Sequence, residues 1–336
     1  MTAPLSQARV RTAIQQHLLA ALPKPESTHR PELAEYARML RDYPERGGKM
    51  LRGMLLVYTG LAYGAELNPL LPIAAALELF QNWALVHDDI EDASDERRGR
   101  PALHKLYGVP LALNAGDALH ALQWALLVRS DAPKPVLLEF ARLVELTAQG
   151  QHLELSWMEH QRFDLQEADY LEMVGQKAAY YTAVAPLRLG ALAAGVEPPA
   201  LFEQAGIKLG IGFQIVDDVL NLEGDPSKYG KEIAGDLWEG KRTLILLHFL
   251  QAASPAERAR AEQLLRTPRG QKSASEVRWL HSRLLQSGAV SYARRRAEAM
   301  LAEGLAALEP VLLKAPRSAV GAAVLELLRS LVQREA

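Results

Sequence analysis

The chain of 336 residues contains no cysteine, which excludes disulfides, thiolate chemistry and cysteine-built zinc sites. Charge of one sign is not in excess: the net charge is -2, which does not indicate a global nucleic-acid-binding surface. Aromatic residues make up only 6%, but 49% of residues are hydrophobic, enough for a large core. We find no signal-peptide pattern, and apolar stretches are broken before they reach the length of a membrane span. We therefore expect a soluble, cytoplasmic protein without stable membrane insertion.

Strand patterns are also scarce, because alternation of apolar and polar residues between turn signals is nearly absent. Apolar residues instead recur three and four positions apart in windows rich in Leu, Ala, Glu and Arg, which predicts helices. The clearest predicted helices are Leu70–Glu91, Ala112–Val128, Val136–Glu159, Leu201–Glu223 and Val290–Ala307. Several are apolar nearly all round and should be buried. We expect one all-α domain that spans residues 1–336.

Breaks between helices are expected at prolines, among them Pro69, Pro110 and Pro310. The region Thr267–Ser275 is rich in Pro, Arg, Gly and Ser and is the best candidate for a mobile loop. The chain after about Leu250 is expected to add helices but no recognisable chemistry.

An acidic cluster, Asp88-Asp89-Ile90-Glu91-Asp92, closes the first of the apolar helices. At about 3.6 residues per turn, Asp88 and Asp92 fall on one face, with Asp89 beside them. Adjacent like charges on an apolar helix are unfavourable unless a cation compensates them. Mg²⁺ is a natural candidate, since it binds carboxylate and water oxygens and shares its shell with substrate phosphates. Taken alone, the cluster is equally consistent with a solvated helix end.

A second acidic cluster follows the same pattern. Asp217 and Asp218 end the apolar helix Leu201–Glu223, and Asn221 adds a third oxygen four residues after Asp217. Two such clusters on different helices suggest facing metal-binding walls, and the explanation of an acidic surface fringe becomes much weaker. Zinc, which prefers nitrogen and sulfur ligands in structural sites, is not indicated.

Positive charge accompanies the acidic clusters. Lys49 and Arg52 stand three residues apart behind Gly48, an arrangement expected to direct both side chains from one helical face toward an anion. Arg97-Arg98-Gly99-Arg100 follows the first cluster, where the helix should give way to a loop. Further candidate cations are Lys177, Lys231 and Lys241. Each alone is more typical of a solvated surface, but in combination with two magnesium-type walls they predict a diphosphate site.

These residues together resemble the trans-prenyl diphosphate synthase family, which includes farnesyl and geranylgeranyl diphosphate synthases. Gly48–Arg52 resembles the family's isopentenyl diphosphate motif, Asp88–Pro101 its first aspartate-rich motif with an arginine tail, and Gly212–Asp218 its second. Gly116–Leu119 and Gly150–Gln151 resemble two further helix signatures. The resemblance implies an isoprenoid synthase fold, in which long helices surround a central apolar cavity, and a magnesium-dependent prenyltransferase.

The resemblance also implies roles for individual residues. The diphosphate of isopentenyl diphosphate would be held by Gly48, Lys49, Arg52, Gln81 and Arg98. The allylic diphosphate would face Arg97, Lys177, Lys231 and Lys241. The Mg²⁺ ligands would be Asp88, Asp92 and Asp217, supported by Asp89, Asp218 and Asn221. The residues expected to act in catalysis are Lys177, Lys241, Gln214 and Tyr181, the last two near the reacting carbons.

Four positions depart from the family pattern. Asn221 stands where Asp is usual, which removes a charge but keeps an oxygen. Ala178 replaces the threonine expected after Lys177, which puts rate or product in doubt. Glu154 replaces an Asp, and Gln81 stands where many bacterial members have His. No departure removes a whole acidic cluster.

Product length is expected to depend on the helix that carries Asp88. The growing chain would pass Ala84 and approach Trp83 and Phe80, about 7.5 and 12 Å below Asp88 at the helical rise. Either aromatic ring could form the floor of the cavity or belong to the ordinary core. The pattern favours geranylgeranyl diphosphate as product, with farnesyl diphosphate second and longer chains as a further alternative.

Two other functions share some of these features. A terpene cyclase or head-to-head synthase uses similar helices and acidic clusters, but it needs no isopentenyl diphosphate site such as Lys49, Arg52 and Arg98 suggest. A non-catalytic partner subunit would be expected to lose an acidic cluster, and both are present. The family resemblance also implies a homodimer, with the helix Ala112–Val128 at the interface.

Overall fold

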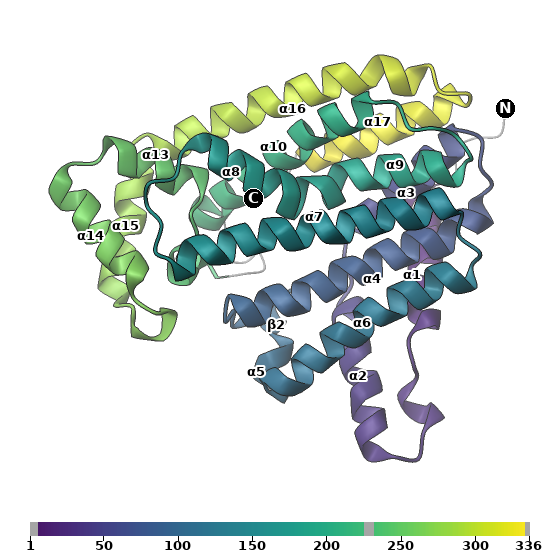
Figure 1. Cartoon of the computed structure of the whole chain (residues 1–336), viewed down its shortest axis with the longest axis horizontal. Coiled ribbons are helices and arrows are strands. Elements are labelled where there is room, and N and C mark those ends of the chain that lie inside the picture. Colours follow the sequence, from purple (N-terminus) through teal and green to yellow (C-terminus); the bar gives the residue numbers. More distant parts are fainter. Residues whose placement is uncertain (1–5, 225–231, 333–336) are drawn as a thin grey trace. The chain divides into compact units, whose positions relative to one another are not determined.

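The computed structural model describes residues 6–224 and 232–332. The chain divides into two compact units: residues 1–141, 185–202 and 308–328 form the first, and residues 142–184, 203–307 and 329–336 the second. The described elements are helices, apart from one hairpin of two short strands (Figure 1). The predicted all-α class is confirmed, whereas the single domain stays a prediction.

The first unit is built around the apolar helix α4. Its elements are α1 (Gln7–Ala21), a 3-10 helix (Pro25–Ser27), α2 (Pro31–Glu45), α3 (Leu51–Ala62), α4 (Leu67–Glu91), β1 (Glu96–Arg97), β2 (Arg100–Pro101), α5 (Leu103–Tyr107), α6 (Val109–Arg129), α9 (Ala185–Ala193) and most of α17 (Ser318–Val332). Helices α4 and α6 lie side by side, and α3 packs on α4 and α9 (Figure 1). The absence of a side chain at Gly190 lets the backbones of α3 and α9 approach closely. A Cβ atom on Gly190 would lie only 2.5 Å from the Leu56 carbonyl oxygen.

The second unit is also helical, and its longest helices are α7, α10 and α16. Its elements are most of α7 (Lys134–Glu159), α8 (Glu167–Val174), a π-helix (Gly175–Val184), α10 (Leu201–Glu223), α12 (Gly235–Glu239), α13 (Leu244–Ala252), α14 (Pro255–Arg266), a 3-10 helix (Arg269–Gln271), α15 (Ala274–Gln286) and most of α16 (Ala289–Leu313). Helix α10 packs closely on α16, since a Cβ atom on Gly212 would lie 2.7 Å from Leu301 Cγ.

The five helices predicted most clearly are confirmed, with small shifts at their ends. The break predicted at Pro310 is wrong, whereas those predicted at Pro69 and Pro110 are confirmed within two residues of a helix start. Pro69 and Pro110 lie in the first turns of α4 and α6, where the missing N–H removes no helical hydrogen bond. Pro310 lies inside α16, which continues to Leu313.

Helix α4 is the one helix among the described residues that is long and apolar enough to cross a membrane, since it contains an 18-residue apolar window with a mean hydropathy of 1.3. The sequence-based statement that no apolar stretch reaches this length is therefore wrong for α4. Of the apolar window, 72% is buried inside the molecule. Helices α1, α3 and α6 pack around it, which is the environment of a core helix.

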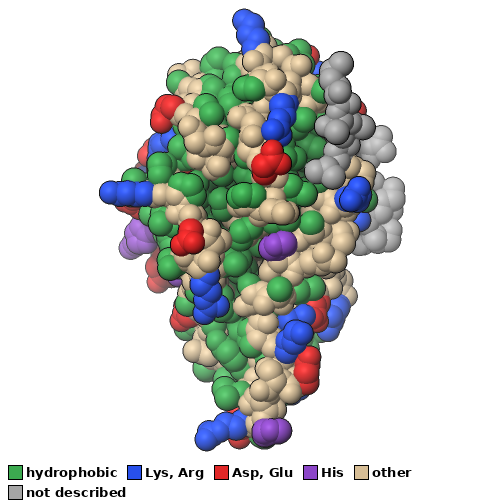
Figure 2. Space-filling view, turned by 90° about the vertical axis from the view of Figure 1, so that its right-hand side faces the viewer, with side chains coloured by type: hydrophobic (Ala, Val, Ile, Leu, Met, Phe, Trp, Pro, Cys, Tyr) green, Lys and Arg blue, Asp and Glu red, His purple; other side chains and the backbone are tan. Residues whose placement is uncertain are grey.

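One face of the molecule shows Lys, Arg, Asp and Glu side chains interspersed over a largely hydrophobic surface, with neither sign dominant (Figure 2). In the first unit, large apolar side chains on α5, α6 and the start of α7 are between 45% and 66% exposed; they are Leu106, Val109, Leu111, Leu113, Val128 and Leu138. The other side of α6, with Ala115 and Leu119, is buried. The prediction that this helix is buried therefore holds for one side only.

Candidate functional site

The two leading aspartates of the first acidic cluster have different surroundings. Asp89 is fully buried; the Tyr43 hydroxyl donates to its Oδ2 at 2.5 Å, and Arg97 Nε lies 3.0 Å from both carboxylate oxygens. The Asp88 side chain is 20% exposed, and its Oδ2 lies 3.3 Å from Arg97 Nη2. Asp92 follows the last helical residue, with its N–H donating to the Asp88 carbonyl at 2.9 Å. Asp89 is thus an internal anchor, while Asp88 stays near the surface of α4.

Arg97 balances the negative charge of the buried Asp89 carboxylate, and Tyr43 donates a further hydrogen bond to it. The Tyr43 oxygen also accepts the backbone N–H of Leu103 at 3.0 Å. Burial and the neighbouring Asp89 carboxylate raise the pKa of Tyr43 well above its ordinary value. Burial lowers the pKa of Arg97, but Asp89 and Asp88 more than reverse this and raise it. Tyr43 therefore stays a hydroxyl donor and Arg97 stays a cation.

Helix α4 ends at Glu91 as expected, and the arginine segment that follows forms a β-hairpin rather than a loop alone. Strand β1 pairs antiparallel with β2, and Arg98 and Gly99 form the turn with φ values of 54° and 70°. Positive φ at both turn positions matches the twist of the two strands. Arg97 consequently points inward to Asp89, and Arg98 Nη1 donates to the Tyr43 carbonyl at 2.6 Å.

The predicted isopentenyl diphosphate residues lie around the start of α3. Arg98 approaches Gly48, since a Cβ atom there would lie 3.5 Å from Arg98 Nη2. The expectation that Lys49 and Arg52 share a helical face is wrong for Lys49, because α3 begins only at Leu51. Gln81, on α4, is buried, and its Oε1 accepts no hydrogen bond within the described residues.

A buried acid behind these cations was not predicted. The Gly53 N–H, in the first turn of α3, donates to Glu78 Oε1 at 2.8 Å. Burial raises the pKa of Glu78, opposed by the Gly53 hydrogen bond and by Arg52 and Arg98. Met50, the N-cap residue, supplies no side-chain hydrogen bond, so Glu78 of α4 caps α3 instead. The only sequence signal was an acidic residue inside an apolar helix.

The second acidic cluster divides its aspartates in the same way. Asp218 is buried; the Tyr170 hydroxyl donates to its Oδ2 at 2.7 Å and Gln214 Nε2 to its Oδ1 at 2.9 Å. Burial raises the pKa of Asp218 to about 7, although both hydrogen bonds oppose the rise. Asp217 is only half-buried on α10. Gln214, predicted to lie near the reacting carbons, therefore has a visible role in holding Asp218.

Asn221 connects this cluster to α12. Its Oδ1 accepts the Asp236 N–H at 3.2 Å, and its backbone carbonyl accepts the Ala234 N–H at 2.7 Å. The departure from Asp thus replaces a charged group by one that receives a backbone hydrogen bond. Its role as a metal ligand stays a prediction.

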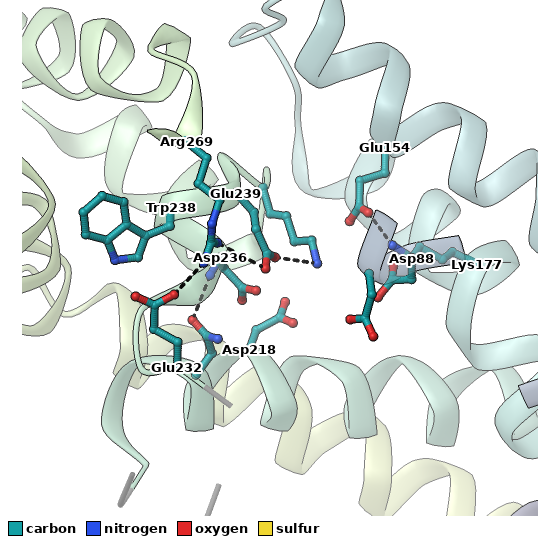
Figure 3. A network of polar contacts seen from close by, with 12 residues as sticks. Asp88, Glu154, Lys177, Asp218, Glu232, Asp236, Trp238, Glu239 and Arg269 are labelled. Carbon is teal, nitrogen blue, oxygen red and sulfur yellow. Dashed lines mark hydrogen bonds and ion pairs between the residues drawn. The ribbon is translucent and has the colours of Figure 1, made fainter. Parts of the chain in front are cut away.

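Lys177, Ala178 and Tyr181 lie on the π-helix. Lys177 Nζ forms an ion pair with Glu154 of α7, the residue that departs from the family pattern (Figure 3). Gly150 lets α7 approach this segment, because a Cβ atom there would lie 2.2 Å from the Lys177 backbone nitrogen. π-helices are rare, and those that occur inside a longer helix are often found at functional sites.

Lys241 follows the C-cap residue of α12, Gly240, and pairs with Glu239, which belongs to a network of charged groups with Arg269 and Glu232 (Figure 3). Its Nζ lies 2.9 Å from Glu239 Oε2. Arg269 pairs with Glu232 at 2.7 Å and lies 3.6 Å from the other Glu239 oxygen. The predicted mobile loop around Arg269 instead contains a 3-10 helix and these ion pairs. The predicted allylic diphosphate residue Lys231 lies outside the described residues.

The aromatic residues proposed to limit product length lie against α6. The Trp83 ring lies 5.3 Å from the fully buried Phe80 ring and stacks on His120 with centroids 4.5 Å apart. Trp83 is only partly buried, and Ala84 next to it is half-buried. The stacking partner, His120, was not predicted, since nothing in the sequence pairs these two positions.

Metal binding has support from ligand chemistry alone. Within residues 6–224 and 232–332, no group of three or more His, Asp or Glu side chains is arranged to hold a metal ion by itself. Asp88, Asp92 and Asp217 offer carboxylate oxygens, the ligand type that Mg²⁺ prefers. The individual site residues therefore stay predictions.

Comparison with known proteins decides the family. The polyprenyl synthetase family model matches residues 34–284. The chain belongs to the polyprenyl synthetase family. A geranylgeranyl diphosphate synthase from Sulfolobus acidocaldarius is 34% identical over 262 residues, which cover 75% of this chain and 77% of the relative. A geranylgeranyl diphosphate synthase from Methanosarcina mazei is 32% identical over 294 residues, 86% of this chain and 87% of the relative.

Solved polyprenyl synthetases share the fold. A polyprenyl synthase from Caulobacter crescentus, complexed with calcium and isoprenyl diphosphate, superposes with a TM-score of 0.84 at 26% identity and 100% coverage of both chains. A geranylgeranyl pyrophosphate synthase from Corynebacterium glutamicum, complexed with isoprenyl diphosphate and magnesium, has a TM-score of 0.84 at 26% identity and 98% coverage of both. The predicted family, fold and enzyme class, a trans-prenyl diphosphate synthase, are confirmed.

Proposed function

We propose that this polyprenyl synthetase condenses isopentenyl diphosphate with allylic diphosphates in a magnesium-dependent reaction, with geranylgeranyl diphosphate as the main product. One observation carries the assignment of the site. In each adjacent Asp-Asp pair, the second aspartate is buried and held by a tyrosine hydroxyl, Asp89 by Tyr43 and Asp218 by Tyr170. The preceding aspartate stays near the surface. Anchored neighbours of this kind orient metal ligands.

Asp88, Asp92 and Asp217 would hold Mg²⁺ together with diphosphate oxygens. When bound, Mg²⁺ supplies positive charge that stabilises the departing diphosphate. Magnesium and calcium in the two solved relatives support this choice of cofactor. Asp89 and Asp218 keep the helix ends, and with them the ligands, in place.

The cations of the chain would bind the two diphosphates. Lys49, Arg52 and Arg98, backed by Glu78, would hold isopentenyl diphosphate, while Lys177 and Lys241 would hold the allylic substrate. Cleavage of the allylic C–O bond leaves negative charge on diphosphate and positive charge on carbon. The double bond of isopentenyl diphosphate then attacks that carbon, and a proton passes to the released diphosphate. Arg97, already paired with Asp89, would act by orienting Asp88.

Product length would be limited at Trp83. Its ring is fixed by contacts with Phe80 and His120, so it is a stable obstacle rather than a mobile side chain. The relatives named as geranylgeranyl diphosphate synthases favour a twenty-carbon product. Farnesyl diphosphate or a longer chain is the alternative, and an octaprenyl diphosphate synthase from Escherichia coli is also a relative, at 31% identity.

A cytoplasmic homodimer is the proposed assembly. The exposed apolar side of α6, which includes Val109, Leu113 and Val128, is a suitable self-complementary surface. Exposed apolar patches of this kind are typical of interaction sites.

The function is tested by incubating the purified protein with Mg²⁺, labelled isopentenyl diphosphate and each of the three short allylic diphosphates, then sizing the dephosphorylated products. A twenty-carbon product is expected. A series of much longer products would support the proposed reaction but show that Trp83 does not form the floor of the cavity. Folded protein that elongates no starter would support the partner-subunit or cyclase alternative.

A further inference from the structure

Helix α12, which precedes Lys241, is held at both ends by groups from elsewhere in the second unit. At its start, Asn221 accepts the Asp236 N–H. At its end, the Lys272 ammonium group donates to the carbonyl oxygens of Leu237 and Trp238, each at 2.7 Å. Carbonyls in the last turn of a helix lack partners inside it, and a lysine is a favourable one. The short helix is therefore tied to the second acidic cluster at one end and to Lys272 at the other.

Lys241 leaves this helix through a tight turn. The N–H groups of Gly240 and Lys241 both donate to the Asp236 carbonyl, at 2.8 and 2.9 Å. Gly240 has φ 85°, and a Cβ atom there would lie 3.4 Å from Lys272 Nζ. Lys272 is thus packed directly against the turn that sets the backbone position of Lys241.

The segment that carries Lys272 contacts this region a second time. Arg269 pairs with Glu232 and approaches Glu239, the carboxylate that also pairs with Lys241 (Figure 3). Lys272 itself is only 8% exposed, although a lysine is rarely buried without a specific partner. Burying an ammonium group costs free energy, and the two charge-assisted hydrogen bonds to backbone carbonyls offset this cost. The arrangement therefore indicates that Lys272 holds these two carbonyls in place.

We infer that Lys272 is a positioning residue for Lys241: by holding the end of α12, it sets the direction in which Lys241 reaches the allylic diphosphate. This inference depends on the proposed function, in which Lys241 binds that diphosphate. Without the two hydrogen bonds, the last turn of α12 is free to relax, and Lys241 moves with it.

The test compares steady-state kinetics of the wild type with Lys272→Met and Lys272→Arg, each substrate being varied in turn. Lys272→Met should raise KM for the allylic diphosphate about tenfold, the effect of losing one charge-assisted hydrogen bond, and leave KM for isopentenyl diphosphate within about twofold. Lys272→Arg, which keeps charged donors, should restore most of the affinity. Lys208→Met, which removes an exposed lysine paired with Glu303 in the same unit, is the matched control and should match the wild type.

A double-mutant cycle separates positioning from general damage. If Lys272 acts through Lys241, adding Lys272→Met to Lys241→Ala should raise KM for the allylic diphosphate little further. Additive effects, an equal rise in both KM values, or a wild-type KM in Lys272→Met would overturn the inference. If Lys272→Met does not fold, Lys272→Gln keeps one donor group and should have an intermediate KM; a wild-type value there would overturn it too. Failure of the wild type to elongate any starter would instead refute the proposed function.

Discussion

Replacing Tyr43 with Phe tests whether the buried aspartate of the first cluster is an anchor. The change removes one hydroxyl, which donates to Asp89 at 2.5 Å and accepts the Leu103 N–H at 3.0 Å. A hydrogen bond to a charged group contributes about 1.5–3 kcal/mol, and a buried N–H left without an acceptor costs about 1–3 kcal/mol. The two terms overlap, because Arg97 continues to hold Asp89. We expect the free energy of unfolding to fall by about 3 kcal/mol.

The assay is thermal and urea unfolding of the wild type, Tyr43→Phe and Tyr170→Phe. A loss of about 3 kcal/mol should lower Tm by roughly 5 °C in a protein of this size. Tyr170→Phe is the matched control: its hydroxyl donates to Asp218 at 2.7 Å, and Gln214 remains as a donor, so a loss of about 1–2 kcal/mol is expected. Tyr43→Phe with a Tm within about 1 °C of the wild type, or a larger loss in Tyr170→Phe, would refute this account.

Three further changes test other parts of the structure. Trp83→Ala removes the ring between Phe80 and His120 and should lengthen the product, as measured by chromatography after dephosphorylation; unchanged length would show that the floor lies elsewhere. Gly150→Ala places a Cβ atom 2.2 Å from the backbone of the π-helix and should cost about 1–3 kcal/mol in urea unfolding, whereas a stability equal to the wild type would mean that the helices separate freely. Burial lowers the pKa of Lys272 from 10.5 to about 8, so the unfolded chain binds this proton more tightly. The free energy of unfolding should therefore rise between about pH 8 and 10.5, by at most about 3 kcal/mol, relative to Lys272→Met; parallel pH curves would contradict it.

Periodicity and motif order were sufficient to predict the helical framework. Helices α4 and α10 are strongly apolar and end in acidic residues, so their limits and their candidate ligands could be predicted together. Membrane-length hydrophobicity in α4 has the same origin, since a helix surrounded by α1, α3 and α6 has no polar face to show. Pro69 and Pro110 mark the starts of α4 and α6, because proline inside a first turn removes no helical hydrogen bond.

Local backbone geometry was harder to predict than the helices that it connects. The Arg98-Gly99 turn depends on positive φ at an arginine, which sequence preferences disfavour but the hairpin requires. The hydrogen bonds of the π-helix Gly175–Val184 span one residue more than those of an α-helix, and no apolar pattern distinguishes the two over ten residues. Lys49 was placed on α3 because helix starts are uncertain by a residue or two.

The division of labour within each aspartate pair follows from helix geometry together with partners distant in sequence. Adjacent residues on an α-helix point about 100° apart, so an Asp-Asp pair at the end of an apolar helix cannot direct both carboxylates into the core. The inward one needs donors, and these come from Tyr43, 46 residues before Asp89, and Tyr170, 48 residues before Asp218. No local pattern predicts such a partner. The outward aspartate is then held in position by its buried neighbour, so under the proposed function both residues of each pair would contribute although only the outward one would bind metal.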